Sequence, residues 1–281
     1  MNFLLLALTL YVFASPSPVK ILTADLRPET LSAFERYVKA SEIRIAREEH
    51  NPNAFLYFDS LPAAQRNQIV SSLKQSHVFI KQLVTLDPSG RAFPVPGGLI
   101  HHWVGIVFIS HVTLRQTLDV VQDYDHQQDD YRPEVIRSRL ISRQGSDFKV
   151  YLRLQEKKII TITLDTDHDV HYAQLDADRW FSRSTSMRIQ EVENAGEPGE
   201  RLLPVGQDGG FLWRMNSYWR FEERDSGVYV QCESISLTRD IPSGFGWLVG
   251  SFVTSIPKES LEETLDQTRA AVVAAASGRR P

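Results

Sequence analysis

The sequence predicts an α+β fold in which an antiparallel sheet curves around a long C-terminal helix, preceded by a small, mainly helical region. Two long strand-like runs, Gly210–Phe221 and Gly227–Thr238, come late in the chain with a short turn between them. After a break rich in Pro and Gly, helical periodicity returns as an apolar stripe of Leu261, Leu265, Thr268, Val272 and Ala275. Because the sheet is the only large partner for that stripe, we expect a cavity or a packed core between them.

The N-terminal residues 1–14 are interpreted as a signal peptide. The run Phe3–Ala14 is apolar, but it is shorter than the about 20 residues that a membrane-spanning helix needs. Small residues at its end suit a cleavage site, although no Lys or Arg precedes it. We therefore expect export to the periplasm or the medium, with residues 15–27 as a linker. The alternative is a cytoplasmic protein in which this run is a buried first strand or helix.

Residues 28–93 are predicted to form the small, mainly helical region. Apolar residues at helical spacing, with a proline in the first turn, predict a helix over Pro28–Glu49. A second helix is expected to begin at Ser60 as its N-cap. A short strand over Val78–Val84 would follow.

The main domain is predicted to span residues 99–278, after a boundary near Pro94–Gly98 where turn-forming residues gather. Its strands are separated by short turns, so neighbouring strands must be antiparallel. The elements expected before the two long strands are the strand His101–Ser110, a helix from Thr113 to about Tyr124, and the strands Val135–Arg143, Phe148–Leu154, Ile159–Leu164 and Ser184–Val192.

The composition limits the possible functions. The 281-residue chain has a formal net charge of -4, so no basic field points to nucleic acid. Cys232 is the only cysteine, which excludes an intrachain disulfide and a multi-cysteine metal site. The histidine spacings match no metal motif, and nucleophile and nucleotide-binding motifs are missing. We therefore assign no catalytic residue, metal or cofactor from the sequence, and the oligomeric state stays open.

Three segments near the C-terminus carry a family resemblance. They are the strand Gly227–Glu233, its exit Ser236–Pro242, and Ser255–Lys258 at the start of the final helix. In these residues and in element order, residues 99–278 resemble the helix-grip fold of the START and Bet v 1-like (SRPBCC) superfamily, as a bacterial member with an extra N-terminal helical region. The resemblance implies a tunnel under the last helix that binds lipids, sterols or polyketides. It does not identify the ligand.

The strand Phe211–Phe221 divides by alternation into two faces. One face is aromatic and is expected to point inward, either as the wall of a cavity or as packed core. It consists of Phe211, Trp213, Met215, Ser217, Trp219 and Phe221. The residues that we predict to line a ligand cavity are Trp103, Phe211, Trp213, Met215, Trp219, Arg188, Arg214, Glu233, Leu261 and Leu265.

Charged residues within the strands offer a second signal. An unpaired charge inside a closed sheet would cost several kcal/mol, so an inward charge must be paired or must meet a ligand. We expect Glu233 to pair with Arg188 or Arg214. The pair would anchor a polar head group or, alternatively, form a salt bridge on the outer, solvated face of the sheet.

The segment Ile241–Val253 combines large apolar residues with glycines. It is interpreted either as a buried turn beneath the last helix or as a lid that makes transient membrane contact and admits a lipid.

Three hypotheses of function follow. The first is a non-enzymatic protein that binds or carries a hydrophobic small molecule or lipid. The second is a polyketide cyclase or aromatase on the same fold, with polar groups such as Arg188, Tyr218, Arg220 and Glu233 in the pocket. The third is an envelope scaffold protein that holds no ligand and recruits a partner through residues 28–90. Fold analogy is the main support for the first two.

Overall fold

A computed structural model describes residues 23–158, 160–240 and 255–279. Its helices are α1 (Pro28–Glu49), the 3-10 helix η1 (Tyr57–Ser60), α2 (Ala63–Lys74), α3 (Leu114–Val121), α4 (Gln127–Asp130) and α6 (Ile256–Ala276). Its strands are β1 (Ala24–Asp25), β2 (Phe79–Gln82), β3 (Gly98–Ser110), β4 (Val135–Gln144), β5 (Asp147–Lys157), β6 (Thr161–Gln174), β7 (Arg179–Glu193), β8 (Arg201–Leu202), β9 (Gln207–Asp208), β10 (Arg214–Arg224) and β11 (Gly227–Arg239).

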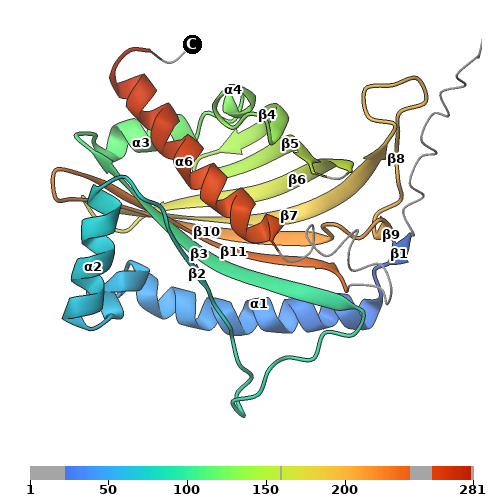
Figure 1. The fold of residues 1–281 in the computed structure, drawn as a ribbon, viewed down its shortest axis with the longest axis horizontal. Helices are drawn as coiled ribbons and strands as arrows, with labels where there is room; N and C mark the ends of the chain where they lie inside the picture. Colours follow the sequence, from blue (N-terminus) through green and yellow to red (C-terminus); the bar gives the residue numbers. More distant parts are fainter. Residues whose placement is uncertain (1–22, 159, 241–254, 280–281) are drawn as a thin grey trace, which may run out of the picture.

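Nine of the described strands form one sheet, in the order β2-β3-β11-β10-β7-β6-β5-β4, with β8 paired to β7. All its pairings are antiparallel, and β1 pairs separately with β9. Figure 1 shows that the sheet is curved, that α6 crosses one face and that α1 runs along the opposite face. We call the α6 side the concave face and the α1 side the convex face.

Helix α6 packs on the concave face through its apolar stripe. Leu261, Leu265, Thr268 and Val272 are buried, in a core that also contains apolar residues of β3 and β11. Gly105 of β3 allows this approach, because a Cβ atom there would lie 2.4 Å from a methyl carbon of Leu265. The stripe that the sequence predicts is therefore the surface that holds α6 on the sheet.

Helix α1 packs on the convex face with its own apolar stripe. Phe34, Tyr37 and Val38 join residues of β10 and β11 in a second core. Strand β2 extends the main sheet by pairing with β3. The region 28–93 thus packs onto the main sheet instead of standing apart from it.

The sequence predictions of fold class and of most elements agree with the structure. Helix α1 spans the predicted Pro28–Glu49, and the sheet with its long C-terminal helix is the predicted α+β arrangement. The second helix begins later than predicted, because a separate 3-10 turn ends at Ser60 and α2 starts at Ala63. None of the described helices is both long enough and apolar enough to span a membrane.

Two predictions concern residues outside the described ranges. They are the signal peptide at residues 1–14 and the two interpretations of Ile241–Val253. Most of the proposed linker 15–27 also lies outside them, although Ala24–Asp25 forms β1.

Candidate functional site

The concave face and α6 enclose a cavity of ≈ 310 Å³. This volume falls within the roughly 300–1,000 Å³ that is usual for small-molecule sites. Apolar side chains from the sheet, from the α3 region and from α6 make up much of its wall. They include Trp103, Val121, Val150, Leu152, Leu164, Val170, Phe211, Met215, Trp219, Phe221 and Leu261.

The structure brings five of the predicted cavity residues together on this wall: Trp103, Phe211, Met215, Trp219 and Leu261. A sixth, Leu265, packs in the adjoining core, where it lies against Gly105. These residues come from β3, from β10 and the segment before it, and from α6.

The alternation of side chains along β10 explains which of its residues line the cavity. From Met215 onward, odd-numbered residues as far as Phe221 line the cavity, whereas Asn216, Tyr218 and Arg220 lie on the convex side. Trp213 precedes the first residue of the strand, so the alternation does not govern it. It lies in the convex-face core, and its indole nitrogen donates a hydrogen bond to Asp208 (3.0 Å).

The three charged candidates also lie away from the cavity. Arg188 pairs with Asp167 across β6 and β7, at 2.7 Å, in a half-exposed position. Arg214 donates a hydrogen bond to the carbonyl of Trp213 (2.7 Å). Glu233 lies on the convex face, where its partners are not the predicted Arg188 or Arg214. Alternation along β11 did not reveal the partners of Glu233, because they are Arg44 of α1 and His102 of β3.

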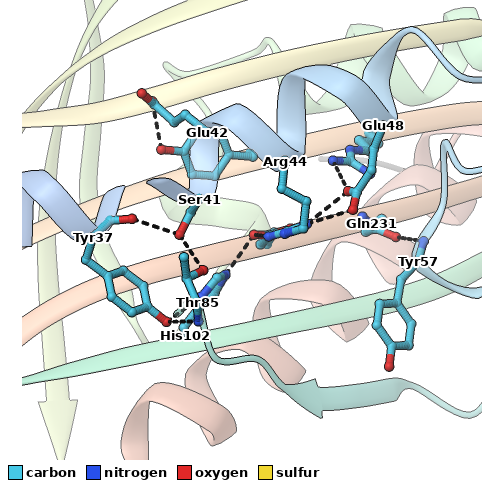
Figure 2. Close-up of polar contacts among 12 residues, drawn as sticks. Tyr37, Ser41, Glu42, Arg44, Glu48, Tyr57, Thr85, His102 and Gln231 are labelled. Carbon is cyan, nitrogen blue, oxygen red and sulfur yellow. Dashed lines mark hydrogen bonds and ion pairs between the residues drawn. The ribbon is translucent and has the colours of Figure 1, made fainter. Parts of the chain in front are cut away.

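Glu233 is the centre of a buried polar network between α1 and the sheet. Figure 2 shows Tyr37, Arg44 and His102, which belong to this network. Glu233 pairs with Arg44 of α1 and accepts a hydrogen bond from Nε2 of His102 (2.7 Å). Nδ1 of His102 contacts the hydroxyl of Tyr37 (2.9 Å), which also accepts a hydrogen bond from the backbone N–H of Thr85 (2.9 Å). Helix α1 is therefore bound to the sheet by polar contacts as well as by apolar packing.

Further contacts of the same kind extend this network along α1. Glu48 pairs with both Arg44 and Arg220, at 2.9 Å each, and Arg220 also donates to the carbonyl of Phe55 (2.6 Å). Burial by itself would raise the pKa of Glu233, but His102 and Arg44 outweigh burial and lower it to about 2. The carboxylate consequently stays charged over the physiological pH range.

The cavity floor is polar but neutral, and three serines define it. In the strand register, Ser234 of β11 lies opposite Ser217 of β10, which lies opposite Ser184 of β7. All three line the cavity, and we call them the serine row. Trp103 of β3 lies opposite Ser234 and extends the row by one strand. Ser182 and Ser236 lie nearby on the same wall.

Two buried histidines also contribute to the cavity wall. His101 contacts the hydroxyl of Thr238 through Nε2 (3.0 Å). His168 contacts the hydroxyl of Thr166 through Nε2 (3.0 Å) and that of Ser184 through Nδ1 (3.4 Å). Burial lowers the pKa of each histidine to about 4, although nearby aspartates partly oppose this shift at His168. Both imidazoles are therefore neutral at pH 7.

The sequence patterns did not identify these polar wall residues as a site. Alternation predicts Ser217 on the inward face of its strand but predicts no role for it. A signal for the others was present in β11, where Cys232, Ser234, Ser236 and Thr238 share one face opposite Glu233. The assembly of the row across three strands depends on the register, which the sequence alone does not show. The described residues contain no group of three or more His, Cys, Asp or Glu side chains placed to hold a metal ion.

The chain is similar to several solved structures at low sequence identity. No protein-family model and no curated protein matches the chain. A STAR-related lipid transfer protein from Xanthomonas axonopodis is similar, with 17% identity, a TM-score of 0.44 and coverage of 65% of this chain and 97% of that chain. Human STARD10 has 10% identity and a TM-score of 0.43, over 78% of this chain and 83% of that chain. The Zhui aromatase/cyclase from Streptomyces sp. R1128 has 12% identity and a TM-score of 0.40, over 63% and 96%.

The topology of the chain itself is that of a helix-grip fold. Strand β3 pairs with the last strand, β11, the remaining strands continue the antiparallel sheet, and the long helix α6 crosses its concave face above a cavity. The protein therefore has a helix-grip fold, as the resemblance of its sequence to the START and Bet v 1-like superfamily predicts.

Proposed function

We propose that this protein binds a hydrophobic small molecule or lipid in the cavity between α6 and the sheet, and that it acts as a carrier. The observation that carries the proposal is the cavity itself, whose ≈ 310 Å³ is bordered by large apolar and aromatic side chains. Burial of apolar surface supplies about 25 cal/mol per Å² of favourable free energy, so such a wall favours a hydrophobic occupant.

A cyclase or aromatase activity has less support. Tyr218, Arg220, Arg188 and Glu233, the residues proposed for it from the sequence, lie outside the cavity wall. The imidazoles of His101 and His168 do line the cavity, but with pKa values of about 4 they are weak bases at neutral pH. The arrangement therefore favours binding over proton transfer.

The scaffold hypothesis also has less support. Helix α1 uses its apolar stripe against the convex face, so that stripe is buried inside the molecule. Among the described residues 28–90, the large apolar side chains that remain exposed are Ile43, Val84 and Leu86.

Two measurements test the carrier proposal. The purified protein is extracted with organic solvent and the extract is analysed by mass spectrometry. Separately, the neutral probe N-phenyl-1-naphthylamine is titrated against the protein and its fluorescence is followed. We expect a co-purifying hydrophobic compound, saturable probe binding, or both. A protein that gives no compound and no probe binding would contradict the proposal.

A matched pair of variants locates the binding. Ser217→Leu adds bulk inside the cavity, whereas Ser146→Leu makes the same change at an exposed turn between β4 and β5. We expect Ser217→Leu to weaken probe binding at least tenfold and Ser146→Leu to leave it unchanged. Equal binding by both variants would place the probe elsewhere on the molecule.

A further inference from the structure

The charge of the cavity wall restricts its ligand. The described residues that line the cavity include no Lys or Arg, and their charged members are Glu134 and Glu156. Both have partners: Glu134 accepts a hydrogen bond from Gln267 (2.8 Å) and Glu156 pairs with Lys158 (3.7 Å). The segment 241–254, which is not described, contains no Lys or Arg in its sequence. A phosphate or carboxylate would therefore meet like charge on this wall and no cation.

His101 presents an acceptor that no described residue uses. The hydroxyl of Thr238 lies 3.1 Å from the carbonyl of Arg239 and 3.0 Å from Nε2 of His101, and we assign its proton to the carbonyl, so that its oxygen accepts from Nε2–H of His101. Neutral imidazole carries one proton, which this contact places on Nε2. Nδ1 of His101 is consequently a lone-pair acceptor without a partner among the described residues. Such an atom is satisfied by an O–H or N–H donor.

Neighbouring wall residues supply further unused groups. The indole N–H of Trp103 is buried and has no partner in the described part of the chain. The hydroxyls of Ser234 and Ser236 likewise make no hydrogen bond with any described residue. In the register Trp103 lies opposite Ser234 and His101 lies opposite Ser236. These four residues therefore form one polar patch on β3 and β11, which we call the β3–β11 patch.

We propose that the cavity selects an uncharged hydrophobic molecule that carries a hydroxyl group, and that the β3–β11 patch binds this hydroxyl. The hydroxyl proton is donated to Nδ1 of His101, and its oxygen accepts from the indole N–H of Trp103 or from a serine hydroxyl. The apolar part of the molecule lies along the wall that includes Leu152 and Trp219. This inference rests on the proposed function and adds the polarity of the ligand.

The test is a competition series in which chain length is constant and only the head group changes. Bound N-phenyl-1-naphthylamine is displaced at pH 8 with 1-decanol, 1-methoxydecane, decanoate or decylamine. The methyl ether keeps the oxygen acceptor and loses the donor, decanoate is negative and decylamine is positive. We expect 1-decanol to compete at least tenfold better than decanoate and decylamine, and about three- to tenfold better than the ether.

Variants then assign the preference to the patch. His101→Phe removes the acceptor of the ligand proton and should bring the ratio of decanol to ether affinity close to one. Ser236→Ala and Trp103→Phe remove donors that the oxygens of both ligands can use, so each should weaken decanol and ether alike, at least twofold, and change the ratio little. Ser146→Ala, at the exposed turn, should leave the ratio unchanged. Because the ratio is measured within each variant, a general loss of affinity does not affect it, and circular dichroism shows whether each variant is folded.

The outcomes separate the two proposals. If the probe binds and decanoate or decylamine competes as well as 1-decanol, the inference about polarity is wrong while the hydrophobic cavity stands. Equal competition by 1-decanol and the ether, or an unchanged ratio in His101→Phe, likewise overturns the role of the patch. If no probe binds to the wild-type protein, the proposed function fails, and this inference fails with it.

Discussion

The two faces of the sheet differ in how they hold polar groups. On the convex face, Glu233 is buried as a charged group that contacts Arg44 and His102. On the concave face, the next residue, Ser234, belongs to the neutral serine row. Consecutive residues of β11 therefore meet opposite environments, because successive side chains of a strand point to opposite faces.

The difference shows where this fold can keep a buried charge. Helix α1 supplies the partners that repay the desolvation of Glu233, in a layer that protein atoms fill. The described residues that line the cavity include no Lys or Arg, and on β7, β10 and β11 the serine row supplies hydroxyls in place of charges. The polar groups of the convex face thus hold α1 on the sheet, whereas those of the concave face include hydrogen-bonding groups that a ligand can use.

The largest expected effect comes from breaking the convex-face network. Glu233→Gln removes the negative charge beside Arg44 and weakens the contact with His102. Removing one partner of a buried pair typically costs about 3–5 kcal/mol, and because Arg44 is 38% exposed we expect about 3 kcal/mol. Urea denaturation measures this loss. A cost below about 1 kcal/mol would show that the network does not hold α1 on the sheet.

Acid sensitivity tests the neutral histidines of the concave face. The pKa of His168 is about 4 in the folded protein and has an ordinary value of 6.5, so between these values the unfolded chain binds a proton that the folded protein does not. Its contribution to stability is complete above pH 6.5 and is lost as pH falls toward 4. Each pKa unit corresponds to about 1.4 kcal/mol, so the full contribution is roughly 3 kcal/mol.

A variant isolates this contribution from those of other groups. Glu191, for example, has a pKa raised to about 7 by burial, so its effect on stability has the opposite sign over much of the same range. His168→Gln can keep the donor to Thr166 but does not titrate. We expect the stability difference between wild type and variant to shift by roughly 3 kcal/mol between pH 7 and pH 4. A difference that is constant with pH would mean that His168 is not buried in its neutral form.

The contact of α6 with β3 gives the next largest effect. In Gly105→Ala the new methyl group would lie 2.4 Å from Leu265 and 2.7 Å from Ile80, so α6 or these side chains must shift. Overpacking of this kind costs about 1–3 kcal/mol. A thermal or urea melt of Gly105→Ala, Leu265→Ala and the double variant checks the mechanism. The double variant should lose less stability than the sum of the single losses, and simple additivity would argue against direct contact.

The smallest effect is expected for an ion pair on the convex side that α1 does not bury. Asp167→Asn removes the partner of Arg188, but both side chains are more than a third exposed. Such pairs contribute about 0–1 kcal/mol, so the urea midpoint should change little. This variant is the matched control for Glu233→Gln. Similar losses in both would remove the distinction between the buried network and the exposed pair.

The patterns that predicted the elements depend on local rules, and these rules held. The stripe from Leu261 to Val272 follows from the 3.6-residue period of a helix, and α6 buries it. Alternation from Met215 to Phe221 predicted the cavity face of β10. The same alternation failed at Trp213, because the regular strand begins one residue later. Local periodicity therefore predicts the face on which a side chain lies only for residues within the regular helix or strand.

The sequence by itself determined the α+β class, the span of α1, the stripe on α6 and the inward face of β10. Each of these features depends on residues that are close together in the chain, because the period of the apolar residues and the residues of the turns determine them. The tertiary structure alone decided the partners of Glu233, the alignment of Ser184, Ser217 and Ser234, and the burial of His101 and His168. Their contacts join residues far apart in the sequence, and strand register and the docking of α1 bring them together.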